Sequence, residues 1–314
     1  MNEELLSLGI PSSSIFERYV GGNSEVIKFK NNKGELRALK IYKGDKKRVS
    51  KMFEKETKSL IFLSDNGFKN VPRQVVSHPN IKAIEYDWIE GQLAEPTDAC
   101  LEAIAEMLNK LIKLSSRNYI FDRAVDSISA PSELLPQIQG RLNRLEDYNS
   151  QYVKKVREKT EVYRTTKNIG FPLGQRILSM SDLGSHNMIA QEGNFFFIDF
   201  EFFGYDSFAK LWGDFLLHPR NHFSTGQLSL IQPSIDVNWE QVRLELEKCA
   251  PALALKWSLI TRGRAERYQG SGQSADETTK LYWRSEKYID FFDFLQEHSD
   301  AAPLMTFHEY ANAT

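Results

Sequence analysis

The chain has 314 residues, of which 41% are hydrophobic and 26% are charged. This ordinary globular composition argues against disorder, and the length leaves room for two packed lobes or two modest domains. The formal net charge of −2 provides no global basic field. We therefore expect no nucleic-acid partner, because such a partner needs a basic surface that the overall charge does not show.

The sequence shows no signal for secretion or for membrane insertion. The start, MNEELLSLGIPSS, lacks a basic segment followed by an apolar core, and no later stretch approaches the ~20 apolar residues that cross a bilayer. Cys100 and Cys249 have no metal-like spacing, so we expect buried free thiols. A cytoplasmic protein follows from these features, and its oligomeric state has no signal in the sequence.

The first 91 residues are dominated by strand-like runs rich in Val, Ile, Phe and Tyr. These runs span 15–20, 25–29, 36–42, 73–77 and 82–89. Apolar spacing predicts one helix over 45–63, which ends at Asn66-Gly67. We expect an antiparallel five-stranded sheet with one inserted helix.

The remainder of the chain is mostly helical in pattern. Helices are predicted over 98–114, within 133–168 and within 239–297. Two strand-like runs, 175–181 and 194–200, flank a polar loop. The fold class is therefore α+β and bilobal, with a small antiparallel-sheet N-lobe over 1–91 and a larger, mostly helical C-lobe over 92–314. Within the C-lobe, we expect the chemistry at 180–206 and substrate-side helices at 207–314.

Three oxygen-bearing side chains stand out in the polar loop and the strand that follows it. Asp182 precedes Asn187 by five residues, and Asp199 ends the apolar run Phe195-Phe196-Phe197-Ile198. An Asp on a loop can direct its carboxylate toward an attacking hydroxyl, while an amide oxygen and a second carboxylate suit the oxygen ligands of Mg²⁺.

These residues resemble the catalytic loop and metal segment of the aminoglycoside phosphotransferase and choline kinase family, which is related to protein kinases. The resemblance rests on D-x-x-x-x-N at Asp182 to Asn187, followed by I-D-F-E at Ile198 to Glu201. It implies a bilobal protein-kinase-like fold. It also implies that Asp182 is the catalytic base or hydroxyl-orienting group, and that Asn187 and Asp199 are the magnesium ligands.

The N-terminal half contains the other parts that such a fold requires. The turn after the first strand, Gly21-Gly22-Asn23-Ser24, resembles the shortened glycine loop of the family. Lys40 on the third strand resembles the lysine that contacts the α- and β-phosphates. The resemblance implies a helix glutamate as its partner, with Glu56 preferred and Glu54 in reserve.

The last predicted strand leads into a segment that resembles the hinge. Backbone groups around Asp87, Trp88 and Ile89 would hydrogen-bond the nucleotide base. The resemblance thus implies a kinase that uses Mg²⁺ and ATP or GTP, with a small-molecule acceptor such as an amino sugar, a sugar or an amino alcohol.

Two positions depart from the family pattern. Met180 stands where the family has a His, and Leu211 stands where choline-kinase-like sequences have the Asp that braces the catalytic loop. Asp206 or Asp214 could take over this bracing. The substitutions keep open a nucleotide-binding pseudokinase with a regulatory or partner-binding role. A transferase that moves AMP onto a protein and a purely structural helical protein also stay open.

The acceptor side of the chain has weaker signals. Asp182, Glu201, Asp206 and Asp214 would concentrate negative charge there, which favours metal ions and then an amino-bearing acceptor. His186 is interpreted as loop packing and His218 as a helix-end residue. A further set lies in the right region to line a pocket, although a surface or core role is favoured for each: Trp257, Arg262, Arg264, Glu266, Tyr268, Trp283 and Arg284.

Overall fold

The computed structural model describes residues 5–6, 8–117, 119, 121–166, 169–271, 274–298 and 305–314. By its internal contacts the chain divides into two compact units. Unit 1 comprises Met1–Glu95 and Ser185–Gly204, and unit 2 comprises Pro96–Gly184 and Tyr205–Thr314. The segment Ser185–Gly204, which we expected in the second lobe, therefore groups with the N-terminal strands.

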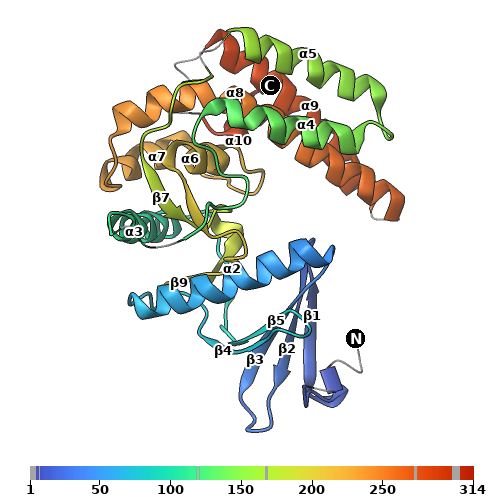
Figure 1. The fold of residues 1–314 in the computed structure, drawn as a ribbon, viewed down its shortest axis with the longest axis vertical. Coiled ribbons are helices and arrows are strands. Elements are labelled where there is room, and N and C mark those ends of the chain that lie inside the picture. The colour runs from blue at the N-terminus through green and yellow to red at the C-terminus, as the bar shows by residue number, and fades with distance from the viewer. Residues whose placement is uncertain are drawn as a thin grey trace. The chain divides into compact units, whose positions relative to one another are not determined.

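Unit 1 is built on the antiparallel sheet predicted from the sequence (Figure 1). Its spatial order is β1-β2-β3-β5-β4. The strands are β1 (Ile15–Val20), β2 (Ser24–Lys30), β3 (Leu36–Tyr42), β4 (Gln74–His78) and β5 (Ala83–Asp87). Each of the five predicted strands is present, with its ends shifted by at most two residues.

The two faces of this sheet bury different sets of side chains, because successive residues of a strand point to opposite sides. One face holds an apolar cluster that includes Ile27, Phe29 and Leu39, packed with Leu5 and Ile10 from the N-terminal segment. On the central strand β3, Ala38, Lys40 and Tyr42 alternate with these apolar positions. The sheet therefore presents Lys40 on the face opposite the apolar cluster.

The inserted helix α2 (Lys46–Asp65) begins and ends where the sequence indicates. Asp45 caps its N-terminus by accepting hydrogen bonds from the N–H groups of Lys47 and Arg48. Gly67 follows the helix with φ +80°, a conformation that glycine adopts readily. The buried face of α2 includes Met52, Leu60 and also the carboxylate-bearing Glu56.

A three-stranded sheet completes unit 1. It is formed by β6 (Gln92–Leu93), β8 (Met188–Gln191) and β9 (Asn194–Phe197), in the order β6-β8-β9. The strand predicted over 194–200 thus ends at Phe197, three residues early, because Asp199 adopts φ +70° and breaks the extended backbone.

Unit 2 is mainly helical, as expected. Its longest helices, α8 (Trp239–Ser271) and α9 (Ala275–Glu297), pack against each other, and α4 and α5 pack on α8 (Figure 1). The other elements are α3 (Asp98–Ser115), α4 (Leu134–Leu145), α5 (Ser150–Thr166), α6 (Phe208–Leu217), α7 (Thr225–Ile231), α10 (Phe307–Ala313) and the paired strands β7 (Arg176–Ser179) and β10 (Gly204–Ser207).

The other sequence expectations for the core are also met. Cys100 and Cys249 are free and buried, and burial raises the pKa of the Cys100 thiol to about 12. No helix in the described ranges combines the length and the apolarity that a membrane span requires.

One glycine of unit 1 gives a direct test of the packing of β6 on β8. Gly91 has φ +142°, and a Cβ atom there would lie 2.3 Å from the Ala190 carbonyl oxygen. We expect Gly91→Ala to destabilise the protein by about 3 kcal/mol, through both strain and overlap. Gly34→Ala is the matched control, since Gly34 has φ +78° but open space around it, and we expect a cost of about 1 kcal/mol. Thermal and urea unfolding measure both, and equal losses would contradict this packing.

Candidate active site

The ammonium group of Lys40 is the centre of a cluster of charged side chains in unit 1. Its Nζ lies 2.6 Å from Glu56 Oε2, 2.7 Å from Asp199 Oδ1 and 3.3 Å from Glu201 Oε2. Lys40 is only 4% exposed. A buried cation needs such partners, because an unpaired charge in the interior is very costly.

The partner of Lys40 on α2 is Glu56, the preferred glutamate, whereas Glu54 is exposed. Two tyrosine hydroxyls also donate hydrogen bonds to Glu56. The Tyr42 hydroxyl is 2.5 Å from Oε2, and the Tyr86 hydroxyl is 3.0 Å from Oε1. Both carboxylate oxygens of Glu56 are therefore occupied, which fixes the orientation of the Lys40–Glu56 pair.

The charges of this cluster shift the pKa of its members in opposite directions. Burial by itself lowers the pKa of Lys40, but the charges of Asp199 and Glu56 raise it well above its ordinary value. Burial, followed by the charge of Asp199, raises the pKa of Glu201 to about 7. Lys40 therefore stays protonated, while Glu201 is the group whose charge responds near neutral pH.

The sequence groups Glu201 with the acids of the acceptor side and not with the assigned nucleotide or metal ligands, yet it belongs to the cluster around Lys40. The carboxylates of Glu56, Asp199 and Glu201 offer oxygens that lie within 4.8 Å of one another. Glu201 lies two residues after Asp199 in the I-D-F-E sequence, and this position could have predicted its place in the cluster.

The two predicted metal ligands lie on neighbouring backbone segments. The Ile198 N–H donates to the Asn187 carbonyl oxygen at 2.9 Å, which places Asn187 beside the segment that leads to Asp199. The Asp199 side chain is 37% exposed, in contrast to 2% for Glu56. Carboxylate and amide oxygens are the ligands that Mg²⁺ prefers, so this set fits a hard divalent cation.

The predicted glycine loop forms a tight turn between β1 and β2. The Gly21 N–H donates to the Ser24 carbonyl oxygen at 2.8 Å, and Gly21 and Gly22 are exposed. The Asn23 side chain extends from this turn and donates to Glu201 Oε1 at 2.8 Å, and it accepts from Arg48 at 2.9 Å. The turn is thus tied both to the I-D-F-E segment and to α2.

At the predicted hinge, part of the backbone is already used within unit 1. The Asp87 N–H donates to the Arg73 carbonyl oxygen at 3.1 Å, and the Trp88 N–H donates to the Leu36 carbonyl oxygen at 3.3 Å. The Asp87 carboxylate pairs with Arg37 and Arg73. Base recognition by Asp87, Trp88 and Ile89 stays a prediction, and these bonds restrict it to carbonyl groups and to the Ile89 N–H.

Asp182 belongs to unit 2, on a loop whose backbone is held at several points. Ser181, with φ +71°, donates from its N–H to Ser179 Oγ at 2.8 Å and from its hydroxyl to the Val125 carbonyl oxygen at 3.2 Å. On the other side, the Asn221 side chain donates to the Leu183 carbonyl oxygen at 3.1 Å. A strained non-glycine residue held in this way is common at functional sites.

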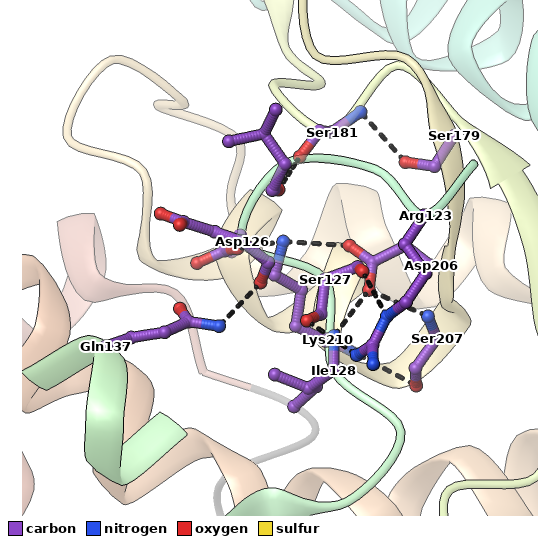
Figure 2. Close-up of polar contacts among 12 residues, drawn as sticks. Arg123, Asp126, Ser127, Ile128, Gln137, Ser179, Ser181, Asp206, Ser207 and Lys210 are labelled. Carbon is purple, nitrogen blue, oxygen red and sulfur yellow. Dashed lines mark hydrogen bonds and ion pairs between the residues drawn. The ribbon is translucent and has the colours of Figure 1, made fainter. Parts of the chain in front are cut away.

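The segment that holds Ser181 is itself fixed by Asp206 (Figure 2). Asp206 Oδ1 accepts from the Ile128 N–H at 3.2 Å and the Ser207 N–H at 2.8 Å, and Oδ2 lies 2.8 Å from Lys210 Nζ. Leu211, where the family has its bracing Asp, is buried among apolar residues, as is Met180. Of the two acids considered for this role, Asp206 contacts the segment 123–128, which in turn holds Ser181 in the loop of Asp182.

The unit boundary falls between Gly184 and Ser185, inside the D-x-x-x-x-N segment. Asn187 and Asp199 lie in unit 1 and Asp182 lies in unit 2. The convergence of these three side chains on one metal and one acceptor therefore stays a prediction.

Solved structures with the same arrangement of elements are small-molecule kinases. A choline kinase from Cryptosporidium parvum matches with a TM-score of 0.63 at 11% identity, over 96% of this chain and 95% of its own. A choline kinase from Streptococcus pneumoniae matches with a TM-score of 0.57 at 16% identity, over 92% and 97%. An amicoumacin kinase in complex with AMP-PNP and Ca²⁺ matches with a TM-score of 0.62 at 13% identity, over 98% and 96%.

This chain has the protein-kinase-like fold. The resemblance drawn from Asp182 to Asn187 and from Ile198 to Glu201 is thereby confirmed at the level of the fold, as is the α+β class. No protein-family model matches the sequence, and no curated protein matches it significantly. The identities to these solved structures are only 11–16%, so the similarity rests on the fold and on a few short motifs and not on the overall sequence.

The raised pKa of Glu201 predicts a specific pH dependence of stability for the metal-free protein. The folded-state pKa of about 7 exceeds the ordinary 4.5, so the contribution of Glu201 to stability falls as the pH rises through that interval. Glu201→Gln keeps this position neutral. We expect its melting temperature to match that of the wild type near pH 5 and to exceed it by a few degrees at pH 8. Glu54→Gln, at an exposed site on α2, should show no such trend, and a constant offset for Glu201→Gln would contradict the assignment.

Proposed function

We propose that this protein is a small-molecule kinase that transfers the γ-phosphoryl group of ATP or GTP to a hydroxyl of a small acceptor. The observation that supports this most strongly is the buried Lys40 paired with both Glu56 and Asp199. A lysine held by a helix glutamate, beside the Asp that follows the catalytic loop, is the arrangement that positions nucleotide phosphates in kinases. A cytoplasmic location is part of this proposal.

In the proposed reaction each of this chain's residues has one task. Lys40 holds the α- and β-phosphates, and backbone amides of Gly21 to Ser24 cover the triphosphate. Asn187 and Asp199 would hold Mg²⁺, which when bound neutralises charge on the β- and γ-phosphates. Asp182 orients the acceptor hydroxyl and takes its proton. The acceptor oxygen forms a bond to the γ-phosphorus while the bond from that phosphorus to the β-phosphate oxygen breaks, so the products are the phosphorylated acceptor and the nucleoside diphosphate.

Two structural features favour catalysis on a small acceptor over a regulatory pseudokinase. Asp206 braces the segment beside Ser181, so the loss of an acid at Leu211 does not leave the catalytic loop unsupported. The chain also passes from Asp199 to the start of α6 at Phe208 within nine residues, which leaves no room for a long activation segment. Small-molecule kinases do not need such a segment, since it serves to position protein substrates.

The roles of the two aspartates predict distinct kinetic losses. Asp199→Ala should abolish magnesium-dependent turnover, because it removes a metal ligand. Asp182→Ala should lower kcat by about 10²-fold or more, the usual range for a group that accepts or orients a proton. Nucleoside diphosphate release, measured across a panel of sugars, amino sugars, amino alcohols and nucleosides, reports both. Asp290→Asn, at an exposed position on α9, is the control and should behave as the wild type.

The pseudokinase hypothesis predicts a different pattern for the same proteins. The nucleotide would raise the melting temperature, but no acceptor would increase nucleotide consumption above background. Wild-type turnover in Asp182→Ala would contradict the assigned role of that carboxylate.

A further inference from the structure

The acids that the sequence places near Asp182 do not create a negative surface in unit 2, because buried lysines neutralise them. Lys210 Nζ lies 2.8 Å from Asp206 and 3.1 Å from Asp214, and Lys256 Nζ lies 2.6 Å from Asp214. Burial raises the pKa of Asp214, but Lys256 and Lys210 lower it below its ordinary value. The expectation of an amino-bearing acceptor rested on this negative charge, so the charge of the acceptor has to be judged from other residues.

A row of aromatic rings leads away from Asp182 within unit 2. His218 Nε2 lies 3.7 Å from Asp182 Oδ1. The His218 ring meets Trp257 edge to face, with centroids 4.9 Å apart, and Trp257 stacks on Tyr288 at 6.5 Å. A hydrogen bond fixes the orientation of the Trp257 indole, since its Nε1 donates to Asp214 at 2.9 Å. This row links the catalytic carboxylate to the helices α8 and α9.

Two arginines lie on the helix faces that carry Trp257 and Tyr288. Arg264 lies seven residues after Trp257 on α8, and Arg284 lies four residues before Tyr288 on α9, spacings that return to the same helix face. Because α8 and α9 pack against each other through the Trp257–Tyr288 contact, both arginines lie along these faces, displaced from that contact. The charges of both act on the Tyr288 hydroxyl and lower its pKa against the larger effect of burial.

These two guanidinium groups lack counterions. Arg264 and Arg284 are half-buried, and neither forms an ion pair or a hydrogen bond with any residue in the described ranges. The neighbouring Arg262 differs, because it pairs with Glu266 at 3.0 Å and stacks on Tyr152 and Tyr282. Partly desolvated arginines without partners are unusual for a purely structural role, in which such charges are paired.

The other titratable groups beside these arginines are His308, whose lowered pKa favours the neutral ring, and Glu309. His308 on α10 stacks on His222 with centroids 4.3 Å apart, and its pKa is lowered by burial, by His222 and by Arg284. Glu309, the acid next to it, is occupied by Thr225, whose N–H and hydroxyl both contact its carboxylate. Glu309 and Asp214 are the acids whose charges act on this region, and within the described residues neither forms an ion pair with Arg264 or Arg284.

We propose that Arg264 and Arg284 form an acceptor subsite for an anionic group, a phosphate monoester or a carboxylate, on the molecule whose hydroxyl approaches Asp182. This inference rests on the proposed kinase function and names its substrate class. A rise of 1.5 Å per residue separates Arg264 from Trp257 by about 10 Å along α8, the scale of a phosphorylated or acidic sugar laid along the indole. Two guanidinium forks match the paired oxygens of phosphate and carboxylate.

The experiment compares acceptors that differ only in the anionic group. Ribose and ribose 5-phosphate, glucosamine and glucosamine 6-phosphate, and glucose and gluconate are each tested for stimulated nucleoside diphosphate release. We expect kcat/KM to be at least about tenfold higher for the anionic member of at least one pair, with phosphate and carboxylate distinguished by which pair responds. Arg264→Gln and Arg284→Gln should each lower kcat/KM for that acceptor by about 10- to 100-fold, mainly through KM, the loss expected for one charged contact.

Controls separate this subsite from the rest of the enzyme. Arg264→Lys should recover part of the loss, and Arg243→Gln, at an exposed i,i+4 pair on the same helix, should have no effect. Calorimetry of the anionic sugars with the wild type, under saturating non-hydrolysable nucleotide, measures binding independently of turnover, and both glutamine variants should weaken it.

The outcomes for the subsite and for the kinase function are distinct. One outcome would overturn the anionic subsite and leave the kinase function standing. In it, neutral or cationic acceptors are turned over in an Asp199-dependent way, and neither glutamine variant changes that turnover. The subsite is also overturned if anionic and neutral partners do not differ in either binding or turnover. Arginine-dependent binding of an anionic sugar without any phosphoryl transfer would support the subsite and count against the kinase function.

Discussion

The structure of unit 1 depends on the burial of one positive charge. Lys40 projects from the central strand of the sheet into a nearly dry environment, where an ammonium group is stable only with carboxylate partners. These come from three places far apart in the sequence: Glu56 on α2, and Asp199 and Glu201 after β9. The requirement to pair this charge therefore brings together the strand, the helix and the I-D-F-E segment.

The same principle explains how unit 2 accommodates an apolar residue at Leu211. A buried acid is still present near the loop of Asp182, but it is Asp206 on β10, which pairs with Lys210 on the first turn of α6. Its two oxygens accept from backbone N–H groups and from the ammonium, so each is satisfied. The Lys210 ammonium is part of this arrangement, because a buried carboxylate without a countercharge would be destabilising.

Charge pairing also changes the view of the acceptor side. From the sequence alone, Asp206 and Asp214 are expected to add negative charge to the acceptor side. In the structure they are buried and form ion pairs with Lys210 and Lys256. Arg264 and Arg284, in contrast, are half-buried and form no ion pair with a described residue. The sign of a site depends on which charges are unpaired, and composition alone does not contain that information.

The sequence by itself determined the elements and the local motifs. Short runs rich in Val, Ile, Phe and Tyr predicted the five strands, and apolar spacing that includes Met52 and Leu60 predicted α2. The glycine turn, Lys40 and I-D-F-E were recognised as motifs, because all of these are short-range patterns. Only the tertiary structure decided which distant groups meet: Glu201 with Asn23, Asp206 with the backbone at Ile128, and His218 with Trp257. Periodicity indicates which side of an element is buried. The partner of a buried polar group depends on how several elements pack together, and the local sequence therefore does not predict it.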